Sequence, residues 1–150
     1  MADFTHLQGL RVDDNATAEF CFYRIAGEPT LTVRPAHESN REFFNAALKK
    51  SKAAMRRLRG RKGQMPTPET IEQARQEDIR LFAKHVVVSW TGVVEASGGE
   101  VELTEEVCRQ FLEAIPSDMF TELRAFCLDI DNFRDEDCMD ADELDELGKS

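Results

Sequence analysis

The alternation of apolar and polar residues predicts two β-strands near the start of the chain. Aromatic and β-favouring residues fill positions 19–25, and positions 30–34 alternate polar with apolar side chains. A Gly-Glu-Pro sequence separates the two runs, as expected for a short connection. Pro35 ends the second run, because proline lacks the backbone N–H that a sheet needs. We therefore predict an N-terminal β-hairpin over residues 18–35.

Helical periodicity begins directly after this hairpin. Between residues 40 and 59, apolar residues recur every three or four positions, and basic residues occupy many of the others. Ser39 or Asn40 can cap the helix by accepting a hydrogen bond from its first free N–H groups. We predict a basic amphipathic helix over residues 40–59, and from its glycines and proline a flexible linker over residues 60–66. The predicted apolar face consists of Phe44, Leu48, Met55 and Leu58.

The following part, residues 67–133, is predicted to be mainly helical. Thr67 and Pro68 have the chemistry of a helix start, and we expect this helix to run to about Val88. Trp90 lies just beyond it and is interpreted as a packing anchor. A Ser-Gly-Gly turn between two short apolar runs predicts a second, short hairpin.

Two further helices are predicted before the chain becomes strongly acidic. Thr104 caps the first, which Pro116 stops, and the second runs to about residue 133. The pattern predicts an α+β fold that is mainly helical, with about four helices and the two hairpins, as one domain over residues 1–133. Residues 134–150 hold too few apolar side chains to pack well, so we predict a disordered or weakly helical acidic tail.

Composition supports a globular domain rather than a membrane or disordered protein. The 150 residues are 41% hydrophobic and 32% charged. No apolar stretch approaches the ~20 residues that span a bilayer, and the start of the chain lacks the pattern of a signal peptide. We therefore expect a cytoplasmic location and no membrane contact.

Charge is strongly segregated along the chain. Residues 40–62 carry nine basic and one acidic side chain, which sum to +8, whereas residues 129–150 carry two basic and ten acidic, which sum to −8. This polarity predicts an electrostatic partner or self-association between the two segments. Nucleic acid is less favoured, because no aromatic residue interleaves with the cations and the whole chain has a net charge of −10. The candidate basic face is Lys49, Lys50, Lys52, Arg56 and Arg57.

Residues that commonly carry chemistry form no recognisable site. The three histidines do not stand at zinc-ligand spacings to one another or to cysteine. A calcium loop beginning at Asp129 fails because Phe133 and Arg134 occupy positions that need an oxygen ligand and a glycine. Motifs for a catalytic nucleophile or a phosphate-binding loop are absent from the sequence. We expect no catalysis, metal or cofactor, and free thiols at Cys21, Cys108, Cys127 and Cys138.

Several short motifs follow one another in a characteristic order. The strand pair ends in Val-Arg-Pro-Ala, and Asn-Arg-Glu-Phe-Phe-Asn at residues 40–45 opens the basic helix. In residues 78–93 a helix runs into a W-x-G-V corner. A short hairpin, a helix that closes at Ile-Pro, and a helix that ends in Asp-x-x-Asn-Phe come next. Over about residues 30–133, this order resembles the tail assembly chaperones of long-tailed bacteriophages.

The resemblance implies a non-enzymatic role. Such chaperones bind the long helical tape-measure protein, keep it soluble and recruit tail-tube subunits to it, and they are generally absent from the finished particle. The family commonly makes a longer product by ribosomal frameshifting, so the resemblance implies that this chain is the short form. Two other hypotheses are a structural tail or connector protein of the virion, and a small nucleic-acid-binding regulator that uses the basic helix 41–62.

The two last predicted helices carry the candidate partner-binding residues. A protein that binds helical apolar segments needs amphipathic helices that can form a groove. The alternative is that these side chains fill the core of the domain, which we favour for most of them. The candidate residues are Phe111, Leu112, Phe120, Leu123 and Phe126.

Overall fold

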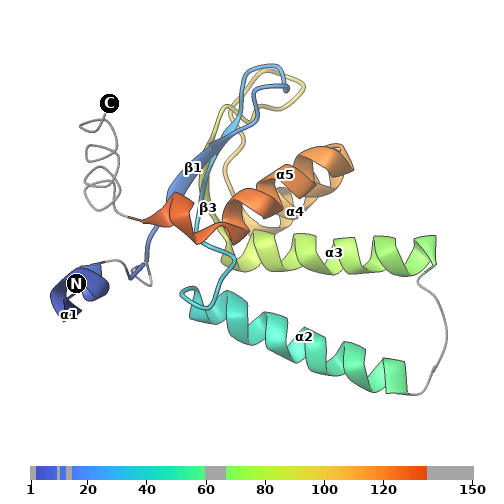
Figure 1. Ribbon diagram of the computed structural model, residues 1–150. Helices are drawn as coiled ribbons and strands as arrows, with labels where there is room; N and C mark the ends of the chain where they lie inside the picture. The colour runs from blue at the N-terminus through green and yellow to red at the C-terminus, as the bar shows by residue number, and fades with distance from the viewer. Residues whose placement is uncertain (1–2, 10, 13–14, 60–66, 135–150) are drawn as a thin grey trace, which may run out of the picture.

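A three-stranded antiparallel sheet with helices on one side forms the body of the protein (Figure 1). The computed structural model describes residues 3–9, 11–12, 15–59 and 67–134. The predicted linker 60–66 and residues 135–150 of the predicted acidic tail lie outside these ranges. The elements are α1 (Phe4–Gly9), β1 (Ala18–Cys21), β2 (Thr30–Val33), α2 (Arg41–Arg59), α3 (Pro68–His85), β3 (Val87–Thr91), α4 (Glu105–Ala114), α5 (Ser117–Leu128) and the 3₁₀ helix η1 (Ile130–Phe133).

The predicted N-terminal hairpin is confirmed and gains a third strand. β1 and β2 pair antiparallel, with Phe20 opposite Leu31, and β3 adds to the other edge of β2, with Trp90 also opposite Leu31. Alternate residues point to opposite faces of a strand, so Phe20, Leu31 and Trp90 share the face that packs on the helices. The opposite face carries polar residues such as Thr32 and Ser89, as is usual for a sheet with one face in water.

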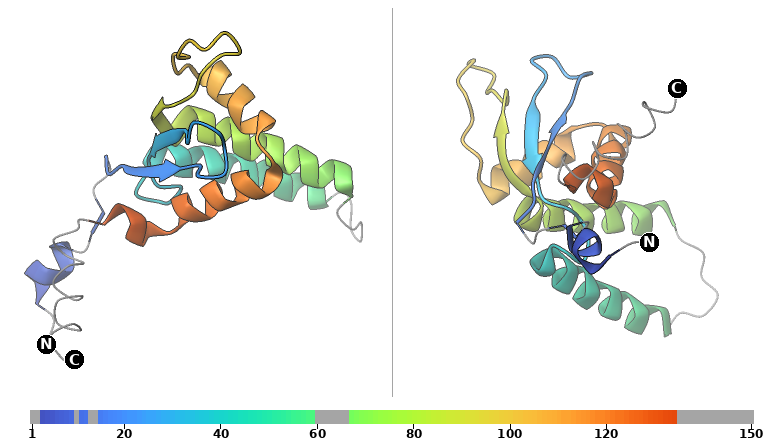
Figure 2. Two further views of the ribbon diagram at one scale, coloured as in Figure 1. Left: turned by 90° about the horizontal axis from the view of Figure 1, so that it is seen from above. Right: turned by 60° about the vertical axis from the view of Figure 1, so that its left-hand side comes forward.

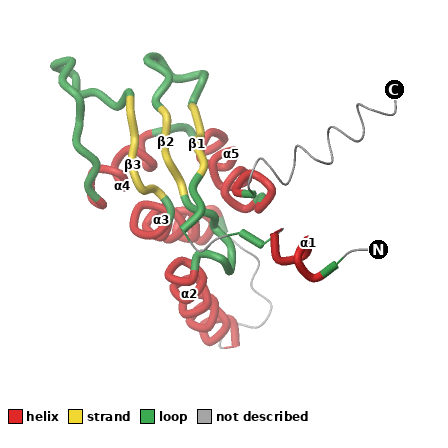
Figure 3. Tube along the Cα trace, turned by 90° about the vertical axis from the view of Figure 1, so that its left-hand side faces the viewer, coloured by secondary structure: helices red, strands yellow, loops and turns green. Residues whose placement is uncertain are grey.

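The core lies between this sheet and helices α3, α4 and α5 (Figures 2 and 3). α2 packs on the outer side of α3, and its Phe43 reaches the core by packing against Phe82. Phe82 of α3 packs edge-on against Phe120 of α5, with 5.4 Å between ring centroids. The largest fully buried apolar side chains include Phe82, Leu31, Ile79, Leu112, Leu123, Val33 and Val86.

The predicted extension of the third helix to Val88 is wrong. α3 ends at His85, Val86 forms its C-cap, and β3 begins at Val87. Three consecutive valines favour a strand because their branched side chains lose rotamer freedom in a helix. β2 then supplies the hydrogen-bonding partner that makes the strand possible, and Trp90 packs from it against Phe111 at 5.5 Å.

The second predicted hairpin is reduced to a turn and one bridge. Val94 and Glu100 form an isolated antiparallel bridge, and the Nε1–H of Trp90 donates to the Val101 carbonyl at 2.9 Å. Gly98 has the positive φ of +89° that the predicted turn requires. The turn is therefore as expected, but the flanking residues form no strand.

The C-terminal helices lie where the sequence places them, with one difference at their end. Thr104 caps α4 and Pro116 separates it from α5, which ends at Leu128 rather than near residue 133. The last residues form η1, whose start is capped by the Asp129 carboxylate. The short helix α1 was not predicted. Within the described ranges, every helix is too short or too polar to cross a bilayer.

Candidate partner-binding surface

Helix α2 is attached to the body mainly through its first turns. The Asn40 side chain, which is completely buried, accepts a hydrogen bond from the Phe43 N–H at 3.4 Å and so caps the helix. Its Nδ2 donates to the His85 carbonyl at 2.9 Å, at the end of α3. Phe43 packs edge-on against Phe82 at 5.9 Å. The predicted cap therefore also joins α2 to α3.

A second attachment lies two turns further along α2. The Lys50 ammonium lies 2.8 Å from Asp78 and 3.6 Å from Glu77, both on α3. Asp78 also lies 3.6 Å from the Arg124 guanidinium of α5. These half-buried ion pairs fix the rotation of α2 about its own axis, because Lys50 must face α3.

This rotation leaves an apolar stripe of α2 exposed. Phe44, Leu48 and Met55, which we call the α2 stripe, have 39%, 45% and 62% of their surface exposed. Their spacing of four and seven residues places them on one side of the helix. Phe43, Ala46 and Ala47 pack toward the body instead. Phe44, Leu48 and Met55 of the predicted apolar face therefore face solvent, and the Leu58 side chain lies outside the described residues.

A partly enclosed apolar cavity lies beside the α2 stripe. It has a volume of about 330 Å³ and lies between α2, α3 and α5. Ala47 and Ser51 line its α2 wall and stand one helical turn from Phe44 and Leu48, so the stripe borders the opening. The other apolar lining residues include Phe43, Leu81 and Leu128.

The opposite border of the α2 stripe is basic. Lys49, Lys52 and Arg56, which we call the basic face, are exposed and make no ion pair within the part of the chain that the structure describes. Helical spacing places them together on the side of α2 away from α3. Lys50 does not belong to this surface because it is paired with Asp78, and the Arg57 side chain lies outside the described residues.

Three of the five residues proposed from sequence to line a groove are buried, and Phe111 and Phe126 are partly buried. Leu112, Phe120 and Leu123 are 0%, 3% and 0% exposed. Phe111 contacts the rings of Phe22 and Trp90, and Phe126 contacts those of Phe20 and Phe133. The interpretation that these side chains fill the core is the one that the structure bears out, because the sheet covers the apolar faces of α4 and α5. Leu112, Phe120 and Leu123 would be available to a partner only if the domain opened.

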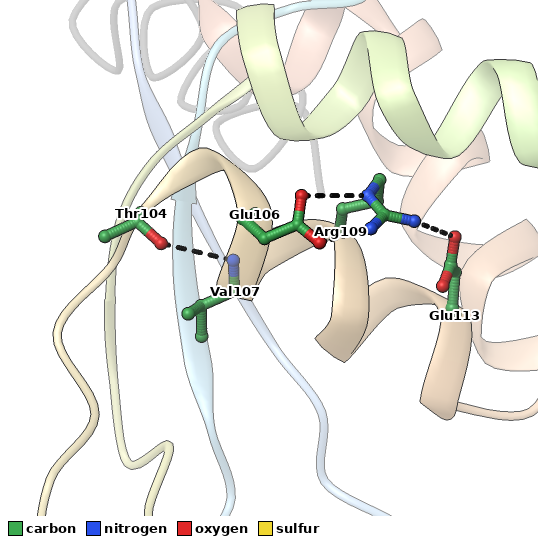
Figure 4. A network of polar contacts seen from close by, with 5 residues as sticks. All are labelled: Thr104, Glu106, Val107, Arg109 and Glu113. Atoms are coloured by element: carbon green, nitrogen blue, oxygen red, sulfur yellow. Dashed lines mark hydrogen bonds and ion pairs between the residues drawn. The ribbon is translucent and has the colours of Figure 1, made fainter.

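Exposed charges on α4 form a local network rather than a site (Figure 4). Thr104 Oγ1 accepts from the Val107 N–H at 3.2 Å, and Arg109 binds both Glu106 and Glu113, the latter at 2.8 Å. The hydrogen bond from Arg109 lowers the pKa of Glu106, and the same contact raises the pKa of Arg109. Such surface pairs contribute little to stability, and both carboxylates here share the single guanidinium of Arg109.

Side chains that could support catalysis or metal binding are scattered. Burial raises the pKa of the Cys108 and Cys127 thiols to about 12, which leaves them protonated at neutral pH. Among the described residues, no group of three or more His, Cys, Asp or Glu side chains converges on a point where a metal could bind. The surface features that stand out are therefore the α2 stripe, the adjoining cavity and the basic face.

Comparison with known proteins places the chain in a phage family. A family model described as YdaY prophage protein matches residues 39–143, from the cap of α2 to beyond η1. The match leaves out β1 and β2 but includes every residue of the α2 stripe and the basic face. No curated protein and no solved structure matches the chain. The chain therefore belongs to the YdaY prophage protein family and is of phage origin.

Proposed function

We propose that this chain is a non-enzymatic tail assembly chaperone that acts in the cytoplasm of the bacterial host. It binds the tape-measure protein, keeps it soluble and recruits tail-tube subunits to it. The phage family and the order of sequence motifs support this role. The observation that carries the proposal is the exposed α2 stripe, which adjoins an apolar cavity and a basic face.

A long helical partner suits this surface. Amphipathic helices bind by laying an apolar face into a hydrophobic groove, with anchors at three- and four-residue spacings. Phe44 and Leu48 offer one such spacing, and the cavity between α2, α3 and α5 lies alongside them. Lys49, Lys52 and Arg56 add positive charge at the border, which selects acidic residues on the partner and speeds association.

Coexpression with the tape-measure protein of the same genome tests this function. The wild-type chain is expected to move the tape-measure protein from the insoluble to the soluble fraction. The double variant Leu48→Ser/Met55→Ser is expected to lose most of this effect, because it removes two apolar anchors. Both side chains are exposed, so each substitution is expected to change the free energy of unfolding by no more than about 0.5 kcal/mol.

The matched control is Val88→Ser/Val94→Ser. These two residues are 50% and 57% exposed but lie away from α2, on β3 and the loop that follows it. This control is expected to keep the tape-measure protein soluble. A tape-measure protein that is equally insoluble with and without the wild-type chain overturns the proposed function, and equal losses in both double variants overturn the assignment of the surface.

A further inference from the structure

We propose that the acidic segment 135–150 of the same chain docks on the basic face of α2 and covers the α2 stripe in the free protein. The contact is a property of the isolated chain and does not depend on the identity of any partner. The structure supplies the surface, and the sequence supplies an occupant of complementary charge.

The surface has a charge that the described part of the chain leaves uncompensated. Lys49, Lys52 and Arg56 are exposed and form none of the ion pairs found among residues 3–9, 11–12, 15–59 and 67–134. By contrast, Lys50 and Arg109, which lie on α2 and α4, are each paired with two carboxylates. Three unpaired cations beside an apolar stripe favour an occupant that is both acidic and partly apolar.

The acidic segment has this composition. Residues 135–150 include eight acidic side chains and one lysine, for a net charge of −7. Three large apolar residues, Met139, Leu144 and Leu147, are placed among the carboxylates. Docking pairs the carboxylates with the basic face and the apolar residues with the α2 stripe, and it removes both like-charge repulsion and exposed apolar surface.

The segment begins in the right place. Arg134, the last described residue before the acidic segment, lines one cavity together with Ser39 and Arg41, so it lies near the first turn of α2. Arg56 lies 15 residues along the helix, which is about 23 Å at ~1.5 Å per residue. Sixteen residues span up to about 53 Å when extended, and about 24 Å when helical. Either form reaches the whole basic face.

A tethered segment also has an advantage over free competitors. A short flexible tether gives an effective concentration of about 1 mM or more, which exceeds that of most soluble partners. A tape-measure helix must therefore displace the segment, and this part of the inference rests on the proposed function. Docking of this kind protects the α2 stripe until a partner of higher affinity arrives.

Carbodiimide cross-linking of the full-length free chain tests the contact. This reagent joins a lysine to a carboxylate only when the two are in direct contact. We expect links from Lys49 or Lys52 to carboxylates of residues 135–150, identified by mass spectrometry at low ionic strength. The Lys50 to Asp78 pair, at 2.8 Å, is the internal positive control. The new links are expected to fall severalfold in about 1 M salt, where the screening length is about 3 Å.

Two arginine variants sharpen the test because neither arginine is itself cross-linked. Arg56→Gln removes one cation of the basic face and is expected to lower the yield of the Lys49 and Lys52 links about two- to fivefold. Arg80→Gln removes an exposed cation of α3 and is expected to leave the yield of the Lys49 and Lys52 links unchanged. The Lys50 to Asp78 link is expected to persist in both variants.

Three results overturn the inference. The first is a Lys50 to Asp78 link without any link from Lys49 or Lys52 to residues 135–150. The second is equal loss of those links in both arginine variants. The third is the appearance, in an equal mixture of ¹⁴N and ¹⁵N protein, of light–heavy links in the full statistical proportion, which assigns the surface to a second copy. The cross-linking experiment contains no partner protein, so a negative result in it does not contradict the proposed chaperone function. A negative coexpression result likewise does not contradict the contact between residues 135–150 and α2.

Discussion

Asn40 links two helices at the level of single atoms. Its amide oxygen caps α2 and its amide nitrogen binds the last turn of α3, and the side chain is fully buried. A buried polar group is favourable only while its partners are present. The sequence predicts the cap, since asparagine before a helical run is a common start, but it does not predict the bond to His85, which lies 45 residues away.

Substitution of Asn40 tests this link. Asn40→Ala is expected to lower the free energy of unfolding by about 1–3 kcal/mol, because it removes the cap and leaves the His85 carbonyl without its partner. Chemical denaturation measures the change. Asn45→Ala, at an exposed position of the same helix, is the control and is expected to stay within about 0.5 kcal/mol of the wild type. Equal effects of the two substitutions would contradict this role.

The buried thiols give a second prediction at this scale. In a Cys21→Ser/Cys138→Ser variant, Cys108 and Cys127 are expected not to react with Ellman's reagent until the chain is unfolded, because both are buried and protonated. Burial raises their pKa to about 12, so the free energy of unfolding is expected to fall as the pH rises from about 9 toward 12. In that range the unfolded thiols ionise and the native ones do not. Rapid labelling of the native variant would contradict the burial.

Among the elements, the turns at one end of the sheet are packed closely. Gly92 follows β3 with a φ of +80°, and a Cβ there would lie 3.1 Å from the Pro29 Cα and 3.2 Å from the Gly27 carbonyl oxygen. Gly98 has a φ of +89°, but no atom lies within 4 Å of the corresponding position. The two glycines share the backbone conformation and differ in their surroundings.

This difference predicts unequal effects of alanine. Gly98→Ala is expected to lower the free energy of unfolding by about 1 kcal/mol, because only the left-handed backbone is strained. Gly92→Ala adds a steric clash with the turn between β1 and β2. This clash is expected to lower the free energy of unfolding by about 1–3 kcal/mol more than Gly98→Ala does. Thermal or chemical denaturation of both variants measures the contrast. Equal losses would mean that the two turns do not pack as the structure has them.

Element types were predicted well where local interactions decide them. The caps at Thr67 and Thr104 lie where the sequence predicts them, because a cap needs only a side chain and the N–H three residues later. The strand β3 was missed because its partner β2 lies more than fifty residues earlier in the chain. Periodicity alone does not distinguish a short apolar run that ends a helix from one that joins a sheet.

For the molecule as a whole, the proposed role as an assembly chaperone predicts that the chain is not a component of the finished particle. Mass spectrometry of purified phage particles is expected to find the tail tube and tape-measure proteins without stoichiometric amounts of this chain. The same measurement on lysates of induced cells, which should contain the chain, is the control. Stoichiometric copies in the particle would instead favour a structural tail or connector protein.

The sequence by itself determined the presence of helices α2 to α5, the first hairpin, the segregation of charge and an apolar stripe on α2. The helices and the stripe depend on residues within a few positions of one another, and the hairpin and the charged segments can each be recognised from a continuous stretch of sequence. Only the tertiary structure decided that the sheet covers Leu112 and Leu123, and that Phe44, Leu48 and Met55 remain exposed. Periodicity shows that a helix has an apolar face, but contacts such as those of Asn40 and Lys50 with α3 determine which way that face turns. The candidate surface therefore moved from the C-terminal helices to α2.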